Sequence, residues 1–363
     1  MTVVGFTELL DALLARRGSD LHLHAGAVPA VRVDGRLEPL SAQPVPAELV
    51  SAILASVLSP ARTATWEATG EVLAAVDVAG KGRFRIHAQQ AFDGPGLVVR
   101  RIDTVPPTIE ELGLPPALGT LAEAQRGLVL VGGPPGSGRS ATLTAMVAHI
   151  NQRRAAVVVT VEDPVEARHL PGRAVVIQRE VGHGPGEVAA AMRATRHHDA
   201  DVVVVGCLDE PDALRTALRM ALGSQLVIGV VDAVTVTAAI EDVLAAFPPE
   251  AEGRARAELA SALRGASSQR LLERADGRGR VAAVELLVNS PRVAEAIAEP
   301  TRVGVPTLEQ AMADGGYHGM QTLDQALLRM VGEGLVTRAA ALAAATRPHE
   351  LGIALQAAGL SQL

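Results

Sequence analysis

The first third of the chain alternates hydrophobic and polar residues in short runs. The segment "FTELLDALLARRG" (6–18) has apolar residues at helical spacing and ends at a glycine, which predicts a helix. Later segments alternate with the period of two that is typical of half-buried strands. They are "DLHLHAG" (20–26), "AVRVDGRLEPL" (30–40, with a Gly-containing turn), "GRFRIHAQQ" (82–90) and "GLVVRRI" (96–102). We therefore expect a small α+β domain over residues 1–102.

The hydrophobic pattern changes after a proline-rich segment, "DTVPPTIEELGLPPALG" (103–119), in which we place a linker at 103–116. Beyond it the apolar residues form continuous, strand-length runs. They are "RGLVLVGG" (126–133), "AAVVVTVEDP" (155–164), "DADVVVVGC" (199–207), "SQLVIGVVD" (224–232) and "RVAAVELLV" (280–288). Because helical patterns mostly separate these runs, we expect an α/β domain at 117–290, with a parallel sheet covered on both faces. A helical region should follow at 291–363.

Composition narrows the class of protein. The chain has 363 residues, of which 48% are hydrophobic and 20% charged, as in a folded globular protein. No apolar run reaches the ~18 residues that a membrane span needs, and no signal-peptide pattern opens the chain. The net charge of −7 weighs against nucleic acid as a partner. The single cysteine excludes a disulfide framework and suits a reducing cytoplasm.

The stretch "GGPPGSGRSATL" (132–143) lies between a predicted strand and a predicted helix. That context favours a phosphate-binding loop over an ordinary tight turn that merely needs glycine. Glycines let backbone N–H groups point at a phosphate, and the helix N-terminus favours negative charge. Ser140 supplies the hydroxyl expected on nucleotide-bound Mg²⁺. The expected nucleotide-binding residues are Gly133, Pro134, Pro135, Gly136, Ser137, Gly138, Arg139, Ser140 and Ala141.

Other chemistry-bearing residues have plainer interpretations. The ten histidines include "HLH" (22–24) and "HH" (197–198) but form no helical pair with metal-ligand spacing, so we expect no metal site formed by the protein alone. Cys207 ends a predicted buried strand, and we expect an inert core thiol there rather than a nucleophile.

Several segments beyond the loop carry a family resemblance. They include "SDLHLHAGAVPAVRVDGRLEPL", "GRFRIHAQQAFDGPGLVVRRI", "TIEELGLPPAL", the acidic box "VVTVEDPVE", "IQREVG", "VLAAFPPEAEGRARAELASALRGASSQRLL" and "GMQTLDQALLRMVGEGLVT". From about Thr7 to Glu350 the chain resembles the type IV pilus retraction ATPases of twitching motility, the PilT-like members of the secretion-ATPase superfamily.

The resemblance implies a PAS-like N-terminal domain followed by a RecA-like nucleotide-binding domain. It also implies ATP or ADP with Mg²⁺ as ligands, and a hexameric ring or a mixed ring with a paralogous ATPase. The expected location is cytoplasmic, at the inner face of the cytoplasmic membrane, beside an inner-membrane pilus platform protein. No nucleic acid and no membrane insertion are expected.

Residue roles follow from the same resemblance. Glu162, in the acidic box with Asp163, is the candidate for orienting or deprotonating the attacking water. Arg85 and Arg100 match the arginines that approach nucleotide from a neighbouring subunit, although they could equally be solvated strand charges. Gln269 occupies a position that implies a packing or interface contact.

The chain departs from the family pattern at five positions. Arg139 stands where the family has the loop lysine, and Cys207 stands where it has the glutamate on the Mg²⁺ side. Asp209 replaces an arginine of the family pattern. Gln225 and Asp232 replace the two histidines of the histidine box. A planar guanidinium fits the phosphate cradle poorly compared with a compact ammonium group. A neutral thiol is a poor substitute for a hard oxygen ligand of magnesium.

Three interpretations remain. The chain is a degenerate motor that binds nucleotide and hydrolyses it poorly beside a competent ATPase, an active retraction ATPase, or an interaction protein that keeps the ring fold without nucleotide. Arg139 and Cys207 favour the first over the second, and the loop glycines with Ser140 favour the first over the third. Pilus-extension and secretion ATPases match less well, because they usually carry larger N-terminal regions and often a four-cysteine module.

Overall fold

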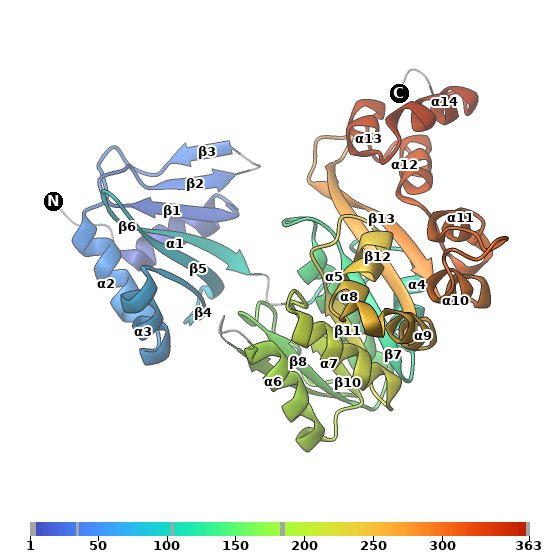
Figure 1. The fold of residues 1–363 in the computed structure, drawn as a ribbon. Coiled ribbons are helices and arrows are strands. Elements are labelled where there is room, and N and C mark those ends of the chain that lie inside the picture. Colours follow the sequence, from blue (N-terminus) through green and yellow to red (C-terminus); the bar gives the residue numbers. More distant parts are fainter. Residues whose placement is uncertain (1–4, 34–35, 103–104, 182–185, 361–363) are drawn as a thin grey trace. The chain divides into compact units, whose positions relative to one another are not determined.

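The structure is a computed structural model that describes residues 5–33, 36–102, 105–181 and 186–360. Contacts divide the chain into two units, Met1–Val105 with Pro164–Arg168, and Pro106–Asp163 with His169–Leu363 (Figure 1). This two-unit α/β organisation confirms the expected fold class. The predicted domain limits at 102, 116 and 290 stay predictions. The turn at 34–35, residues 103–104 of the expected linker and Gly182 of "IQREVG" lie outside the described residues.

The N-terminal unit is a six-stranded antiparallel sheet with the strand order β3-β2-β1-β6-β5-β4. The strands are β1 (Asp20–His24), β2 (Ala30–Val33), β3 (Arg36–Pro39), β4 (Glu71–Val78), β5 (Gly82–Ala91) and β6 (Gly94–Ile102). The helices are α1 (Phe6–Ala15), α2 (Ala47–Val57) and α3 (Pro60–Thr69). The expected first helix and the expected strands are thereby confirmed, whereas α2, α3 and β4 were not anticipated.

Alternation along the strands gives this sheet one apolar and one polar face. Phe84 and Ile86 of β5 are fully buried in the core that α1 and α2 help to form. Arg85 lies between them in sequence, so its side chain leaves from the opposite face. On that face the register pairs Asp20 with Arg100 and Arg100 with Arg85. Arg85 and Arg100, the two arginines expected to approach nucleotide, are therefore neighbours on the polar face.

The C-terminal unit contains a seven-stranded sheet with the order β13-β12-β7-β11-β10-β8-β9. The strands are β7 (Gly127–Gly132), β8 (Val157–Glu162), β9 (Val175–Glu180), β10 (Val202–Val205), β11 (Leu226–Val230), β12 (Leu263–Glu273) and β13 (Arg280–Val288). Six of these strands are parallel, as expected. The expectation of a wholly parallel sheet is wrong for β13, which runs antiparallel to β12. The short connection at 274–279 can close a hairpin but cannot make a parallel crossover.

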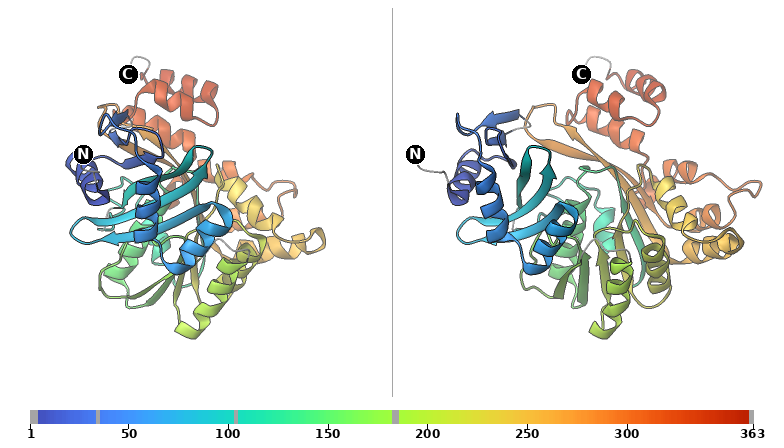
Figure 2. Two further views of the ribbon diagram at one scale, coloured as in Figure 1. Left: turned by 90° about the vertical axis from the view of Figure 1, so that its left-hand side faces the viewer. Right: turned by 60° about the vertical axis from the view of Figure 1, so that its left-hand side comes forward.

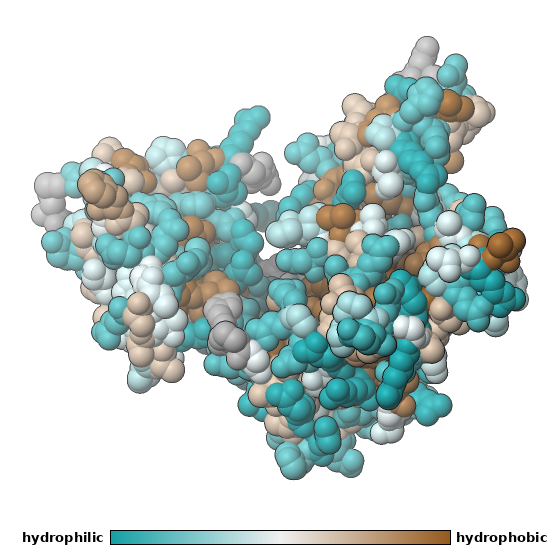
Figure 3. Space-filling view, in the orientation of Figure 1, coloured by the Kyte–Doolittle hydropathy of each residue, from teal (hydrophilic) through white to brown (hydrophobic). Residues whose placement is uncertain are grey.

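Helices cover both faces of this sheet, which confirms the expectation drawn from the continuous apolar runs (Figures 1 and 2). One buried cluster joins the sheet to α4 (Ala117–Ala122) and α5 (Arg139–Arg153). The other joins it to α6 (Glu187–Ala194), α7 (Pro211–Leu222), α8 (Val236–Ala245) and α9 (Glu252–Ala262). Figure 3 shows a largely hydrophilic surface over α6 and α7, the solvent side of these amphipathic helices.

The expected helical region after β13 is confirmed for residues 291–360. It consists of α10 (Pro291–Ala298), α11 (Leu308–Ala313), α12 (Leu323–Gly332), α13 (Arg338–Ala344) and α14 (Pro348–Ala357). Short 3-10 helices occur at η1 (Thr195–His198), η2 (Pro249–Ala251) and η3 (Gly316–His318). No helix in the described ranges is long and apolar enough to cross a membrane.

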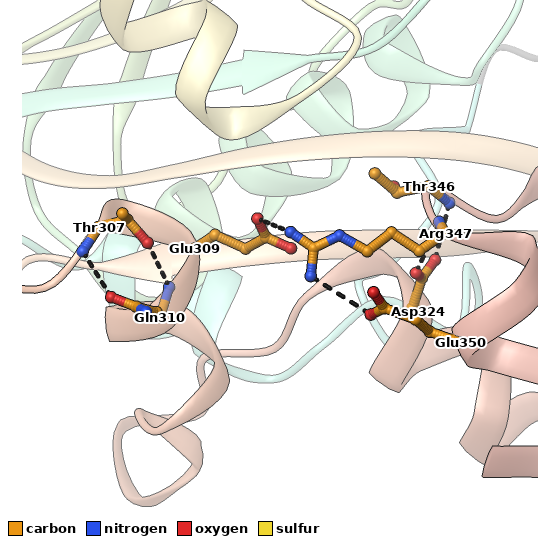
Figure 4. Close-up of polar contacts among 7 residues, drawn as sticks. All are labelled: Thr307, Glu309, Gln310, Asp324, Thr346, Arg347 and Glu350. Atoms are coloured by element: carbon orange, nitrogen blue, oxygen red, sulfur yellow. Dashed lines mark hydrogen bonds and ion pairs between the residues drawn. The ribbon is translucent and has the colours of Figure 1, made fainter. Parts of the chain in front are cut away.

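Polar contacts around Arg347 tie these C-terminal helices together (Figure 4). Its guanidinium pairs with Glu309 of α11 at 2.6 Å and with Glu350 of α14 at 3.4 Å. The carboxylate of Asp324, in α12, accepts hydrogen bonds from the backbone N–H groups of Thr346 and Arg347 at 2.8 and 2.9 Å. One arginine and one aspartate thus connect three helices of the region.

Candidate functional site

The predicted phosphate loop connects β7 directly to α5. Gly133, Gly136 and Gly138 have φ angles of 143°, 78° and 92°, in the region that L side chains rarely adopt. A Cβ added to Gly133 would lie 2.4 Å from the Ser137 hydroxyl oxygen and 2.6 Å from the Gln269 carbonyl oxygen. The loop is therefore packed closely at Gly133, where both backbone conformation and space require glycine, whereas at Gly136 only the backbone conformation does.

Gln269 of β12 is hydrogen-bonded to this loop and to the helix that follows it. Its side-chain N–H₂ donates to the Ser137 carbonyl oxygen at 2.8 Å, and its side-chain oxygen accepts from the Thr142 hydroxyl at 2.8 Å. The residue is only 1% exposed. Its amide therefore joins the loop to the first turn of α5 in a dry environment, where hydrogen bonds are costly to lose. Thr142 was missed by the sequence interpretation, because its partner lies 127 residues further along the chain.

Arg139 is the first residue of α5, yet its side chain contacts the residues that follow β11. One guanidinium nitrogen, Nη1, donates to the Val231 carbonyl oxygen at 2.8 Å and also pairs with the Asp232 carboxylate. The side chain of Arg139 is 15% exposed, whereas that of Asp232 is 56% exposed. Two of the five positions that depart from the family pattern are therefore in direct contact with each other.

Cys207 follows β10 and is exposed, so the expectation of a core thiol is wrong. The strand ends at Val205, and the chain then turns away at Gly206 before the cysteine is reached. Partial withdrawal of the sulfur from water, the hydrogen bond to Asp209 and the carboxylate of Asp232 raise the pKa of the Cys207 thiol to about 12. The thiol stays protonated at neutral pH, which makes it a poor nucleophile. Its soft sulfur is also a poor ligand for Mg²⁺, which prefers oxygen.

Glu162 is the last residue of β8. Its Oε1 accepts hydrogen bonds from the Thr160 hydroxyl at 2.6 Å and from the Gln178 side-chain N–H₂ at 3.3 Å. The side-chain oxygen of Gln178, in β9, accepts from the backbone N–H of His169 at 3.1 Å. Burial lowers the pKa of His169 to about 4, so its ring is neutral. Thr160 and Gln178, which orient the predicted acid–base group, were not singled out from the sequence.

Four neighbouring strands bring most of these residues to one edge of the sheet. The loop follows β7, Asp232 follows β11, Cys207 follows β10, and Glu162 ends β8. The strands are parallel, so these positions all lie at their carboxyl ends, which is where α/β folds bind ligands. Gln225 precedes β11 and therefore lies at the opposite edge, where its N–H₂ donates to the Ala200 carbonyl oxygen at 2.9 Å.

Arg85 and Arg100 belong to the N-terminal unit and are paired within it. Arg100 donates to the Asp20 carboxylate at 2.7 Å, and Arg85 pairs with Glu166 of the short segment that groups with this unit. Burial alone would raise the pKa of Asp20, but hydrogen bonds from Ser19 and Arg100 lower it below its ordinary value. Both arginines therefore have carboxylate partners in the same chain.

The chain is similar in sequence to known secretion and pilus proteins. The family described as Type II/IV secretion system protein matches residues 6–343. The chain belongs to this family. It is 35% identical over 293 residues to the type IV pilus retraction ATPase PilT of Pseudomonas aeruginosa, a match that covers 81% of this chain and 85% of that protein. It is also 32% identical over 292 residues to the type IV pilus ATPase PilU of the same organism, covering 80% and 76%.

Solved structures give the same result. A crystal structure of the pilus retraction motor PilT with bound ADP superposes with a TM-score of 0.85 at 33% identity, over 96% of this chain and 99% of that one. The ATPase DotB of Legionella pneumophila has a TM-score of 0.78 at 20% identity, covering 96% and 94%, and shares the fold. The expected resemblance to PilT-like retraction ATPases is thus confirmed.

The donor atoms at the site fit a phosphate group better than they fit a tightly bound magnesium ion. Ser140 is exposed at the start of α5, and the dipole of that 15-residue helix favours an anion. The residue expected to supply an oxygen on the metal side is instead the protonated thiol of Cys207. Within the described parts of the chain, no group of three or more His, Cys, Asp or Glu residues could hold a metal ion.

Proposed function

We propose that this member of the pilus retraction ATPase family binds ATP or ADP at the loop 133–141 and hydrolyses ATP poorly or not at all. The observation that carries the proposal is the combination of an intact glycine loop with a protonated thiol at Cys207. The loop supplies backbone N–H groups that can bind a phosphate. The thiol stands where the family pattern implies a glutamate, so one oxygen ligand for the magnesium ion is missing.

Binding rests on groups that do not depend on residue 139. Backbone N–H groups of the loop and the N-terminus of α5 would hold the phosphates, and Gln269 keeps that backbone in place. Ser140 would supply the hydroxyl for nucleotide-bound Mg²⁺, which neutralises phosphate charge when bound. The ADP in the related pilus retraction motor supports the assignment of a nucleotide as ligand.

Poor hydrolysis follows from the electrostatics of phosphoryl transfer. The reaction depends on positioning and on charge compensation around the transferred phosphoryl group and the metal ion. Losing one such group commonly costs ~10²–10⁴ in rate. Here Arg139 is engaged by Asp232, and Cys207 carries no charge at neutral pH. Glu162 alone would have to orient the attacking water.

We extend the proposal to the setting in which the protein acts. Family membership supports a hexameric ring or a mixed ring with a competent paralogue, located at the inner face of the cytoplasmic membrane beside the pilus platform protein. In such a ring Arg85 and Arg100 would approach a neighbour's nucleotide only after exchanging Glu166 and Asp20 for phosphate. In this arrangement the protein would regulate or support the competent motor.

The second candidate is an active retraction ATPase, and one observation favours it. Glu162 is held by Thr160 and Gln178, an arrangement suited to orienting a water molecule. The third candidate, an interaction protein without nucleotide, is disfavoured because three glycines at positive φ precede the N-terminus of α5, an arrangement suited to binding an anion.

Binding is tested by calorimetry with ATP and ADP on the full chain and on a Gly138→Leu variant. A Cβ at Gly138 would lie 3.1 Å from the Gln269 side-chain nitrogen in a backbone conformation that strains any side chain, so binding should be lost. The matched control is Gly277→Leu, which has a φ of 69° in a turn with open space around it. Binding that survives Gly138→Leu, or that is absent from the unmodified protein, would contradict the proposal.

A further inference from the structure

The side chain of Arg139 has two hydrogen-bond acceptors outside the phosphate loop. The Val231 carbonyl oxygen and the Asp232 carboxylate both follow β11, the neighbour of β7 in the sheet. The guanidinium is largely covered and the carboxylate mostly exposed. This contact therefore places the one positive side chain of the loop beside β11.

A phosphate group entering the loop would compete with these acceptors. A loop cation normally acts near the β- and γ-phosphates of the nucleotide. Arg139 can act there only if it leaves Asp232, or if it shares its five N–H donors between the two anions. Asp232 and Asp209 both lie close enough to Cys207 to raise the pKa of its thiol. A γ-phosphate that reaches Arg139 would therefore also approach the negative charge of Asp232 and a guanidinium that is already paired.

We propose that Asp232 is a positioning residue that withholds Arg139 from the phosphate loop and so sets the nucleotide preference of the site. The outermost phosphate depends most on the loop cation, so withholding the cation weakens binding of a nucleoside triphosphate more than binding of a diphosphate. The inference rests on the proposed nucleotide site and adds that the unmodified protein favours ADP over ATP.

A simpler account is that Asp232 only repels phosphate through its own charge. The two accounts differ in whether the effect of Asp232 requires Arg139. If Asp232 acts by holding the guanidinium, removing its charge has little effect once the guanidinium is gone. If it acts by direct repulsion, removing its charge strengthens binding in either background.

The test is a double-mutant cycle on the full chain with Asp232→Asn, Arg139→Met and the double variant. Affinities for ADP and for a non-hydrolysable ATP analogue are measured by calorimetry at fixed salt and magnesium. Asp232→Asn should raise the affinity for the ATP analogue by roughly threefold to tenfold, the range that a partly exposed ion pair with a charge-assisted bond can supply. The affinity for ADP should rise less.

The control for charge is Asp242→Asn. Asp242 of α8 lines the same hollow of about 410 Å³ as Asp232 and Asp209, and no ion pair joins it to Arg139 within the described residues. Its substitution should leave both affinities within about twofold of the unmodified values, as expected for a screened surface charge. Thermal unfolding of each variant shows that it is folded.

Three results would overturn the inference. In the first, Asp232→Asn raises the affinity for the ATP analogue just as much when Arg139→Met is also present. In the second, Asp232→Asn raises the affinities for ADP and for the ATP analogue equally. In the third, Asp232→Asn changes neither affinity although the protein binds both nucleotides. The last result leaves the proposed function standing, because binding itself is observed. If neither the unmodified protein nor any variant binds nucleotide, the inference and the proposed function both fail.

Discussion

The Thr142 hydroxyl donates a hydrogen bond of 2.8 Å to the side-chain oxygen of Gln269. The side-chain nitrogen of Gln269 in turn donates to the Ser137 carbonyl oxygen in the loop. One buried amide thus fixes the distance between the loop and the first turn of α5. Because each partner would be left unpaired in a dry environment, we expect this contact to hold the loop in shape before any ligand binds.

Replacing Gln269 with leucine should therefore weaken both folding and binding. Leaving the Thr142 and Ser137 groups unpaired costs about 1–3 kcal/mol of the free energy of unfolding. Nucleotide affinity should also fall, because the loop must then be ordered by the ligand. Urea denaturation and calorimetry measure the two effects.

Gln321→Leu is the matched control for Gln269→Leu. Its side-chain N–H₂ also donates to a backbone carbonyl, that of Val284, at 2.8 Å. It should lower stability while leaving nucleotide affinity unchanged. Equal losses of affinity in the two variants would contradict the role given to Gln269.

Cys207 should react slowly with iodoacetamide despite its exposure. With the pKa of its thiol raised to about 12, only a very small fraction is thiolate at pH 8. Asp209→Asn removes a neighbouring negative charge and replaces one carboxylate oxygen by an N–H₂ donor, so it should lower that pKa and speed the reaction. Mass spectrometry follows the single cysteine without interference. A reaction as fast as that of a free cysteine would show that the thiol environment is described wrongly.

Stability should fall with acidification because of His169. Burial lowers the pKa of this ring to about 4 from its ordinary value of 6.5, so the unfolded chain takes up the proton first. The contribution of His169 is complete above about pH 6.5 and is lost as the pH falls toward 4, by about 1–2 kcal/mol once its partial exposure is allowed for. Urea midpoints between pH 7.5 and 5 should decrease, and less steeply in His169→Gln than in a variant of the exposed His197. If the urea midpoints of the His169→Gln and His197 variants fall equally steeply with pH, the pKa assigned to His169 is wrong.

Restoring the family residues should raise hydrolysis. Arg139→Lys with Cys207→Glu is expected to increase phosphate release more than either change alone, and by more than the product of the two single increases, because both groups act on one magnesium–phosphate unit. Coupled enzymatic detection of phosphate measures the rates. Asp232→His would also restore one of the two histidines that the family pattern implies, and it can be added as a third change. Strictly additive gains would mean that the two positions work independently.

The sequence predicted most of the strands, the helices on both faces and the glycine-rich turn between β7 and α5, because hydrophobic period and glycine spacing are local signals. It did not predict β4, β9 or β12. It could not predict the contact between Arg139 and Asp232, which are 93 residues apart and meet only through the strand order. Nor could it predict that β13 would reverse direction. The structural separation of Gln225 from Asp232 was foreseeable, since seven extended residues at ~3.3 Å each place them at opposite ends of one strand.

The central claim is that nucleotide binding is retained while hydrolysis is impaired. The most direct measurement is steady-state phosphate release on the same preparation that gives a nucleotide-binding isotherm. We predict saturable binding of ADP and ATP together with phosphate release well below ~1 s⁻¹ per subunit, the low end of typical enzyme turnover. Release at ~1 s⁻¹ or faster would contradict the claim, and Glu162 with a repositioned Arg139 would then have to support an active motor.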